Sequence, residues 1–308
     1  MADPVIGFIG LGVMGEPMCR NLRVRGGYRV IAYDLDPAPL KRLEPHRIEA
    51  AEDTGALVRG SDIVLASLPS GRVLADLAYA HGGLLQSIRR GQIFVDLGTS
   101  PVALTRELAA EFLARGVRYL DAPVARTRQA AEEGTLSVMV GGDSDTLEAV
   151  KPVLACFASQ ITHCGALGSG QVTKILNNMV LFQTVAALSE AYAIARRSGV
   201  DPALLFDTLS KGSADSFALR NHGAKAIVPQ VFPLRAFSVE YAKKDLGYAL
   251  ELAAGAGVDA EGARRVDRLF DSAIAQGLGD QYFPAILEVI DPPSRGSPQG
   301  LALDPQND

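Results

Sequence analysis

Three polar side chains interrupt an apolar stretch in the middle of the chain, and their types and spacing suit proton-transfer chemistry. The stretch runs from Gly165 to Gly199, and the polar residues are Lys174, Asn177 and Asn178. At i, i+3 and i+4 they share one face of a helix. The positive end of the helix dipole and partial burial should lower the pKa of Lys174 and ease its proton release, as a general base requires. Alternatively, the lysine reaches solvent and the asparagines bridge neighbouring groups.

One long helix must position these side chains. After a glycine-rich turn, the chain continues for about thirty residues to Ser198-Gly199 without a proline or an internal glycine, which predicts a helix roughly 40 Å long with a glycine C-cap. Between Val172 and Leu188 apolar residues occupy nearly every face, so we expect burial on several sides. A helix of this length can cross a domain boundary.

A glycine-rich turn near the N-terminus predicts a dinucleotide site. The strand-like run from Val5 to Ile9 precedes it, and Glu16 to Val24 reads as a helix. The turn has the pattern G-x-G-x-x-G and consists of Gly10, Leu11, Gly12, Val13, Met14 and Gly15. In this context the glycines permit a tight turn, close approach to a pyrophosphate and close packing of helix on strand.

The next strand-like run ends in an acidic residue that should select the cofactor. Asp34 follows Arg29 to Tyr33, about twenty residues beyond the glycine-rich turn, where a carboxylate binds the adenosine ribose hydroxyls. A carboxylate would repel a 2'-phosphate, so NAD is favoured, while Lys41 and Arg42 keep NADP open. The alternative is that Asp34 caps the helix at Asp36-Pro37.

Alternating strand-like and helical segments continue through the first half, which predicts an α/β fold with a Rossmann-type, doubly wound parallel sheet. The predicted strands are 63–66, 93–96, 117–121 and 136–140, and the predicted helices are 102–115 and 144–157. Loops beyond the carboxyl ends of these strands should contact ligands, unless they are ordinary turns. They are 67–70, 96–99 and 121–127.

The second half predicts an all-helical domain. Asp201-Pro202 has a helix-starting pattern, and helical runs follow at 238–254, 260–276 and 281–290. A proline-rich end follows. We therefore expect a dinucleotide-binding domain at 1–164, a helical domain at 165–290 and a disordered tail at 291–308.

Composition narrows the function. The 308 residues carry a formal net charge of -5 and show no basic cluster, which argues against a nucleic-acid partner. We see no membrane span and no signal peptide. The three cysteines lack C-x-x-C spacing and the four histidines lack metal-ligand spacing, so we expect a cytoplasmic protein with reduced thiols and no metal.

Four segments resemble the β-hydroxyacid dehydrogenase family, which includes 3-hydroxyisobutyrate dehydrogenase. In chain order they are GFIGLGVMGEPM, DAPVARTRQAAEEGTLSVMVGG, GALGSGQVTKILNN and AKKDLGYALELA. The resemblance extends from Ile6 to about Ile290. It implies reversible hydride transfer between NAD(P) and a small hydroxyacid or its semialdehyde, by an enzyme that forms a homodimer or a homotetramer.

The resemblance also implies roles for individual residues. Lys174 would be the catalytic acid and base, and Asn178 would contact the substrate carboxylate. Lys244 would lie near the nicotinamide and the substrate. The residues that would line the cofactor are Leu68, Pro69 and Thr99.

The chain departs from the family pattern around the expected substrate. Ala125-Arg126-Thr127 replaces the usual Ser-Gly-Gly, so Arg126 and Thr127 are candidate substrate contacts, and the arginine could grip a second anionic group or simply point to water. Arg126 and Asn177 are similar to the residues that hold the sulfonate in sulfolactaldehyde reductase, although Leu181 replaces a further polar contact. Succinic semialdehyde or glyoxylate would be other substrates.

Two further departures concern specificity. Gly98 replaces a common serine, and Tyr282-Phe283-Pro284-Ala285 replaces a frequent D-x-S-A. A function of another class is a dinucleotide-binding module without catalysis, like family relatives that lost the lysine. Imine reductases also share the architecture but replace this lysine. The presence of Lys174 counts against both.

Overall fold

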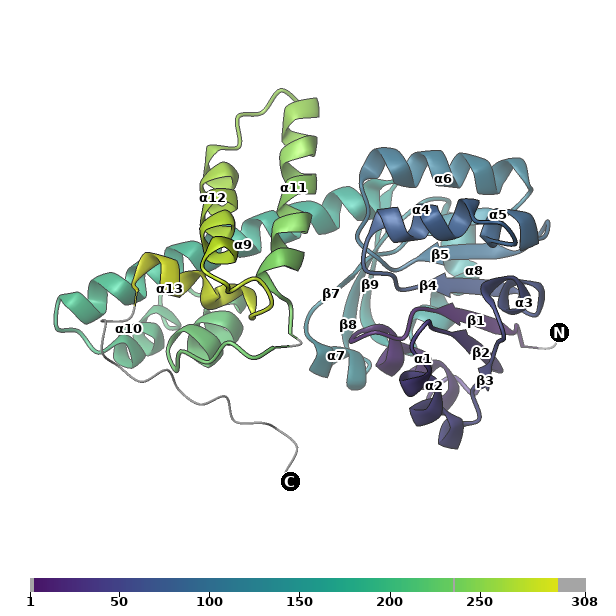
Figure 1. Ribbon diagram of the computed structural model, residues 1–308, viewed down its shortest axis with the longest axis horizontal. Helices are drawn as coiled ribbons and strands as arrows, with labels where there is room; N and C mark the ends of the chain where they lie inside the picture. The colour runs from purple at the N-terminus through teal and green to yellow at the C-terminus, as the bar shows by residue number, and fades with distance from the viewer. Residues whose placement is uncertain (1–2, 235, 293–308) are drawn as a thin grey trace. The chain divides into compact units, whose positions relative to one another are not determined.

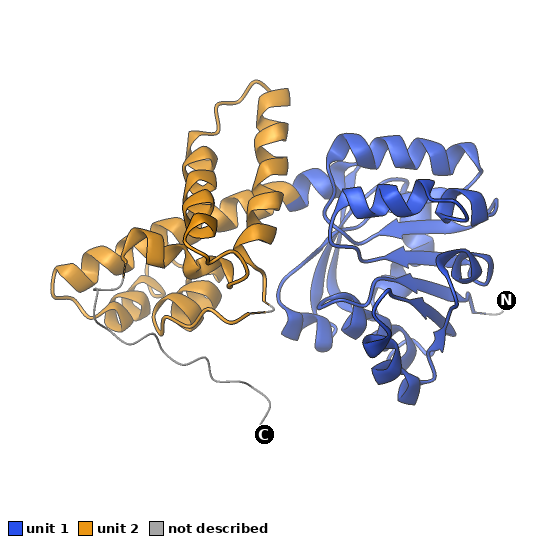
Figure 2. Ribbon diagram, in the orientation of Figure 1, with its two compact units in different colours: residues 1–174 blue, residues 175–308 orange. Residues whose placement is uncertain are grey.

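The computed structural model describes residues 3–234 and 236–292. It divides into two compact units, Met1–Lys174 (unit 1) and Ile175–Asp308 (unit 2), which Figure 2 shows in different colours. The division falls inside helix α9 (Ser169–Arg197), the long helix that the sequence predicts. The proposed domain boundary at 164–165 lies shortly before this helix begins.

Unit 1 contains a sheet with the strand order β3-β2-β1-β4-β5-β6-β8-β7, and β9 pairs with β8 (Figure 1). The pairs that join β3, β2, β1, β4, β5 and β6 are all parallel, which confirms the predicted doubly wound sheet. The strands are β1 (Ile6–Ile9), β2 (Val30–Tyr33), β3 (Glu49–Ala50), β4 (Ile63–Ala66), β5 (Ile93–Asp96), β6 (Arg118–Asp121), β7 (Val124–Ala125), β8 (Leu136–Gly141) and β9 (Ala158–Gly165).

The far end of the sheet is mixed. β8 runs antiparallel to β6 and β7, because the chain continues from β6 into β7 in the same direction and turns back only at α7 (Arg128–Glu132), whereas β9 returns parallel to β8 through helix α8 (Ser144–Leu154). β3, β7 and β9 are additions to the predicted strands: β3 and β7 have two residues each, and the eight residues of β9 are largely exposed, so they carry too little apolar pattern to recognise.

Helices cover both faces of the sheet, and successive strand residues enter opposite cores. In β5, Phe94 packs with Phe112 and Tyr119 on one face, whereas Val95 belongs to the core on the other. Helices α1 (Gly15–Val24), α2 (Pro37–Leu43) and α8 contribute to the Val95 core. Helices α3 (Thr54–Arg59), α4 (Gly71–Tyr79), α5 (Leu84–Ser87) and α6 (Val102–Ala114) contribute to the Phe94 core.

Unit 2 is almost entirely helical, as predicted. Besides its part of α9, it comprises α10 (Pro202–Leu209), the π-helix η2 (Leu219–Ile227), α11 (Val239–Gly255), α12 (Glu261–Ala275), the short 3₁₀ helix η3 (Phe283–Ala285) and α13 (Ile286–Ile290). Unit 1 also contains α7 (Arg128–Glu132) and the 3₁₀ turn η1 (Glu44–His46). Among the described helices, none has the length and hydropathy needed to cross a bilayer.

The helix predicted over 281–290 begins later than expected. Gln281 and Tyr282 are extended, because they form isolated bridges with Leu234 and Ser238. The Tyr282 hydroxyl is also hydrogen-bonded to Nδ1 of His222, a buried ring whose pKa is lowered by burial to about 4. These contacts give Tyr282, which departs from the family pattern, a structural role.

The end of the described chain is tied to α9. The buried Asp291 carboxylate accepts from the guanidinium groups of Arg196 and Arg197, at 2.6 and 2.7 Å. These arginines lie in the last turn of α9, where positive charge complements the helix dipole. Residues 293–308 of the predicted tail lie outside the described residues.

The core of unit 2 centres on Phe182 of α9. Its fully buried ring lies 5.9, 5.5 and 5.2 Å from the ring centres of Phe237, Phe270 and Phe283.

We expect Phe182→Ala to lower the free energy of unfolding by about 3–5 kcal/mol, since it leaves a cavity among three rings. Urea denaturation would measure this change. Leu204→Ala, at a side chain that is 61% exposed, is the control and should change stability by less than about 0.5 kcal/mol.

Candidate active site

The glycine-rich turn has the geometry that a dinucleotide requires. Gly10 has a φ of 90°, in the left-handed region, and a Cβ there would collide with the carbonyl oxygen of Ser67. A Cβ on Gly15 would collide with the carbonyl oxygen of Gly10, so this turn and α1 pack as closely as backbones can. At Gly12 a Cβ would project into open space, where a pyrophosphate can approach the backbone. The turn therefore fits the cofactor.

Asp34 is held at the end of β2 by two backbone N–H groups. Its Oδ2 accepts from Leu11 N at 2.5 Å, and its Oδ1 accepts from Asp36 N at 2.8 Å. The alternative that Asp34 caps α2 is wrong, because Asp36 accepts from Ala38 N and caps that helix. Each carboxylate oxygen of Asp34 keeps a lone pair for a ribose hydroxyl.

The nearby arginine that could favour a 2'-phosphate is already paired. Arg42 donates through Nε and Nη2 to both carboxylate oxygens of Glu16, at 2.8 and 2.7 Å. Glu16 lies in the first turn of α1, so the positive charge of Arg42 is balanced beside the glycine-rich turn. Leu35, directly after Asp34, is 90% exposed and offers a 2'-phosphate no hydrogen bond.

The loops after β4 and β5 meet through Gly98. A Cβ on Gly98 would lie 3.1 Å from the carbonyl oxygen of Leu68 and 3.2 Å from Oδ1 of Asp96. This close approach brings the half-buried Leu68 and the exposed Pro69 beside the loop that carries the buried Thr99. Three predicted cofactor contacts therefore gather at the carboxyl ends of neighbouring parallel strands, as this fold requires.

The start of α9 is fixed to the sheet by Asp121, the last residue of β6. Its Oδ1 accepts from Gly168 N at 2.7 Å and its Oδ2 from Gln171 N at 2.8 Å. The carboxylate is fully buried, and burial raises its pKa while the backbone N–H groups lower it. Because Lys174 lies one turn after Gln171, the carboxyl end of β6 determines the position of this lysine.

Further along α9, the asparagines form a chain of amide contacts. Asn177 is exposed and donates from Nδ2 to Oδ1 of Asn178 at 3.1 Å. Asn178 is 2% exposed and donates from its own Nδ2 to Oδ2 of Asp245 in α11 at 2.7 Å. The orientation of the Asn178 amide is therefore fixed from both ends.

Lys244 forms the other side of this cluster in unit 2. Its Nζ lies 2.8 Å from Oδ1 of Asp245 as an ion pair, and 4.3 and 5.1 Å from the ring centres of Tyr241 and Tyr248. Both atoms of the pair are buried, and neither makes a hydrogen bond of good geometry to any described residue. The ammonium therefore keeps N–H groups for a ligand.

Asp245 was missed by the sequence reasoning. On sequence alone, Lys243-Lys244-Asp245 reads as a charge cluster in solvent. The structure corrects this for Asp245, which is 1% exposed and contacts both Asn178 and Lys244, whereas Lys243 pairs with Asp267 and Asp271. The signal in the sequence that could have identified Asp245 is a carboxylate at an otherwise apolar position of a predicted helix.

Arg126 occupies strained backbone. Its φ is 92°, in the region that favours glycine, and its Nη1 donates to the carbonyl oxygen of Thr135 at 2.8 Å. Thr127 caps α7 by accepting from Ala130 N at 3.3 Å, so its hydroxyl has a structural contact. Arg126 is exposed, and its remaining N–H groups can reach a ligand.

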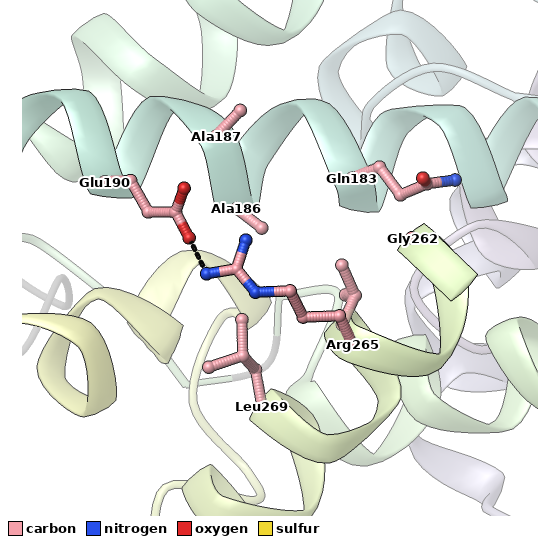
Figure 3. Close-up of a pocket in the computed structure, with 8 residues that line it drawn as sticks. Gln183, Ala186, Ala187, Glu190, Gly262, Arg265 and Leu269 are labelled. Atoms are coloured by element: carbon pink, nitrogen blue, oxygen red, sulfur yellow. Dashed lines mark hydrogen bonds and ion pairs between the residues drawn. The ribbon is translucent and has the colours of Figure 1, made fainter.

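A pocket of about 120 Å³ lies within unit 2 between α9 and α12, and Figure 3 shows its lining residues. Arg265 and Glu190 form an ion pair across it. Gly262 approaches Gln183 so closely that a Cβ there would collide with the Gln183 amide. The pocket shares no residue with the predicted site.

Two family models match the chain. The model described as the NAD binding domain of 6-phosphogluconate dehydrogenase matches residues 5–165, and the model described as NAD-binding of NADP-dependent 3-hydroxyisobutyrate dehydrogenase matches residues 168–290. The glycine-rich turn and Asp34 lie within the first match, and Lys174 and Lys244 lie within the second.

Individual relatives agree with these models. The chain is 32% identical to 2-(hydroxymethyl)glutarate dehydrogenase of Eubacterium barkeri, over 92% of this chain and 94% of the relative. It is 34% identical to 3-hydroxyisobutyrate dehydrogenase of Pseudomonas aeruginosa, over 80% and 84%. The solved structure of 3-hydroxyisobutyrate dehydrogenase of Mycobacterium tuberculosis with L-serine is similar with a TM-score of 0.84, at 31% identity, and the match covers 94% of this chain and 99% of that one.

The fold and these matches define an oxidoreductase that binds NAD(P). The chain belongs to the β-hydroxyacid dehydrogenase family and is an NAD(P)-dependent hydroxyacid dehydrogenase.

A buried carboxyl beside the site should make stability depend on pH. Burial raises the pKa of Asp96 to about 7, against the lowering effect of hydrogen bonds from Gly98 N and the Ser100 hydroxyl. The pKa of Asp96 in the folded protein exceeds the unfolded value of 3.8, so the protonated carboxyl contributes its full share to the free energy of unfolding below about pH 4. This contribution is lost as the pH rises to 7 and the carboxyl ionises. We expect the free energy of unfolding of Asp96→Asn, measured by urea denaturation, to rise by about 2–3 kcal/mol relative to that of the wild type as the pH is raised from 5 to 8. A difference independent of pH would contradict this assignment.

Proposed function

We propose that this chain is an NAD-preferring dehydrogenase that transfers a hydride reversibly between the cofactor and a small anionic hydroxyacid or its semialdehyde. The observation that carries the proposal is the arrangement of α9, where Lys174 follows the Asp121-anchored first turn and precedes the Asn178 amide held by Asp245. Family membership supports the reaction class.

The preference for NAD rests on charge. Asp34 at the end of β2 accepts ribose hydroxyls and repels a 2'-phosphate. The Glu16 carboxylate occupies Arg42 through two hydrogen bonds, so this arginine is already neutralised. Lys41 remains exposed in α2 and is a weaker contact for a phosphate.

The chemistry assigns each group a separate task. When bound, the nicotinamide ring supplies a hydride acceptor or donor at its reactive carbon. During oxidation, Lys174 in its neutral form accepts the proton of the substrate hydroxyl as the carbinol C–H bond breaks and the carbonyl forms. During reduction, the Lys174 ammonium returns a proton to the carbonyl oxygen. Asn178 would donate its second amide N–H to the substrate carboxylate, and Lys244 would help to hold the substrate or the cofactor through its ammonium N–H groups.

The role of Lys174 can be tested by replacement. We expect Lys174→Ala to lower kcat by about 10³-fold, because proton transfer loses its general acid and base. Lys174→Arg should also be inactive, since a guanidinium does not release its proton near neutral pH. The measurement is NADH oxidation with semialdehydes, and NADH affinity from fluorescence titration should stay within about threefold.

The matched control is Lys151→Ala, which removes an exposed lysine of unit 1 that pairs with Glu148. Its kcat should equal that of the wild type. If Lys174→Ala kept full turnover, the assigned mechanism would be wrong.

For the substrate, we propose a semialdehyde or hydroxyacid with a second anionic group bound by Arg126. A non-glycine residue at a φ of 92° costs of order 1–3 kcal/mol, and such strain is typically kept at functional positions. The relative from Eubacterium barkeri is named for a glutarate derivative, which is a dicarboxylate. Sulfolactaldehyde, succinic semialdehyde and glyoxylate, which carry one anionic group each, are the alternatives, so a dicarboxylate such as 2-(hydroxymethyl)glutarate is the doubly anionic compound to compare with them.

Arg126→Ala tests this specificity. We expect kcat/KM for oxidation of 2-(hydroxymethyl)glutarate to fall by about 100-fold, the value of a charge-assisted contact of 2–3 kcal/mol, while kcat/KM for the singly anionic glyoxylate changes by less than about threefold. Arg128→Ala is the matched control, because Arg128 is an exposed arginine two residues away that pairs with Glu132. Equal losses for singly and doubly anionic substrates would exclude Arg126 as the specificity determinant.

We also propose a domain boundary, a cellular location and an oligomeric state. The two family models meet between residues 165 and 168, which supports a domain boundary at 164–165. Cys19, Cys156 and Cys164 are free thiols, which supports a cytoplasmic location. Leu176, Val180 and Ile194 are exposed apolar side chains of α9, which supports a homodimer or homotetramer.

A further inference from the structure

We propose that Gln171 is a positioning residue for Lys174, because its side chain locks the first turn of α9 to the loop that carries Thr99. This inference rests on the proposed function, in which Lys174 transfers the proton and Thr99 lines the cofactor. Gln171 itself makes no contact with the reacting groups in this scheme; it acts through the helix. All the residues involved lie in unit 1.

The Gln171 side chain is fully buried, and its amide is used at both ends. Oε1 accepts from Ser100 N at 3.0 Å. Nε2 donates to the carbonyl oxygen of Gly98 at 2.9 Å and faces Oδ2 of Asp96 at 3.4 Å. Two of these contacts hold Gly98 and Ser100, the chain neighbours of Thr99, so the loop cannot shift without breaking buried hydrogen bonds.

The loop is in turn fixed to β5 by Asp96, which is 1% exposed. Its Oδ1 accepts from Gly98 N at 2.9 Å, and its Oδ2 accepts from the Ser100 hydroxyl at 3.2 Å. The Tyr119 hydroxyl lies 3.5 Å from the same Oδ2. Gln171 therefore binds a loop that is already closed on the end of its strand.

The backbone of the same helical turn is held from the other side. Asp121 accepts from Gln171 N, so one residue is anchored through its main chain to β6 and through its side chain to the loop after β5. A Cβ on Gly170 would collide with the carbonyl oxygen of Met139, and a Cβ on Gly141 would lie 2.5 Å from Oδ1 of Asp121. The absence of both side chains lets the helix start sit directly on the strand ends.

This double anchor fixes both the height and the rotation of the helix where Lys174 stands. Asp121 alone would hold the turn to β6 through two neighbouring backbone N–H groups, and the Gln171 side chain adds a second attachment, to the loop after β5, that opposes tilting and rotation of the turn. Lys174 lies three residues on, about 4.5 Å along the axis and on the same side of the helix. Since a misplacement of about 1 Å can cost about 100-fold in rate, the anchor bears directly on proton transfer.

A double-mutant cycle tests the inference. Gln171→Met keeps the volume and removes the hydrogen bonds. We expect it to lower kcat by about 30- to 100-fold in the otherwise wild-type enzyme, with NADH affinity within about threefold. In the Lys174→Ala background, the same change should lower the residual kcat by less than about threefold, because the group that Gln171 positions is gone. Thr173→Ala is the control, since Thr173 lies in the same turn, is exposed and donates its hydroxyl back to Ser169 O of its own helix.

The outcomes separate this inference from the proposed function. Equal losses in both backgrounds would show that Gln171 acts independently of Lys174 and would overturn the positioning role alone. Full turnover of Lys174→Ala would overturn the proposed mechanism and this inference with it. If Gln171→Met failed to fold by circular dichroism, Gln171→Ala, which keeps the main-chain bond to Asp121, would replace it in the same cycle with the same expectation.

Discussion

The rest of the molecule depends on two hydrogen bonds that the Asp121 carboxylate accepts from backbone N–H groups at the start of α9. A helix start leaves N–H groups without partners, and a buried carboxylate needs donors, so each satisfies the other. The carboxylate ends β6, and β6 lies beside β5 in the parallel sheet. Through this one contact, the strand order of the sheet determines where the longest helix begins.

From that origin, α9 connects two kinds of environment. Its first residues are docked on strand ends among glycines, and Phe182, further along, lies at the centre of an aromatic core. The polar residues stand between these two apolar regions. The buried amide of Asn178 is satisfied by the hydrogen bond that it donates to Asp245. The buried carboxylate of Asp245 is in turn balanced by the positive charge of Lys244. The polar groups of the site are thus mutually dependent.

Much of the fold and part of the site could be predicted from sequence, because those features are written in local patterns. The strands β4 and β5 and the helix α9 follow from apolar runs and breakers, and Gly10, Gly12 and Asp34 follow from a fixed spacing. Gln171, Asp96 and Asp245 could not be recognised in the same way. Each is an ordinary polar residue until the fold brings a partner 67 to 75 residues away against it. The pairing of Arg42 with Glu16 is likewise invisible to spacing, although it bears on the choice of cofactor.

The ion pair between Arg197 and Asp291 has a consequence for the order in which the chain folds during synthesis. The two residues are 94 positions apart, and they join the end of the helix that opens unit 2 to the last described turn of the chain. During synthesis at about 5–20 residues per second, α9 therefore waits several seconds on the ribosome before the carboxylate that closes its end is made. Unit 1 has all of its own sequence by then and can fold first. The growing chain thus gains its dinucleotide-binding sheet before it gains a closed helical unit.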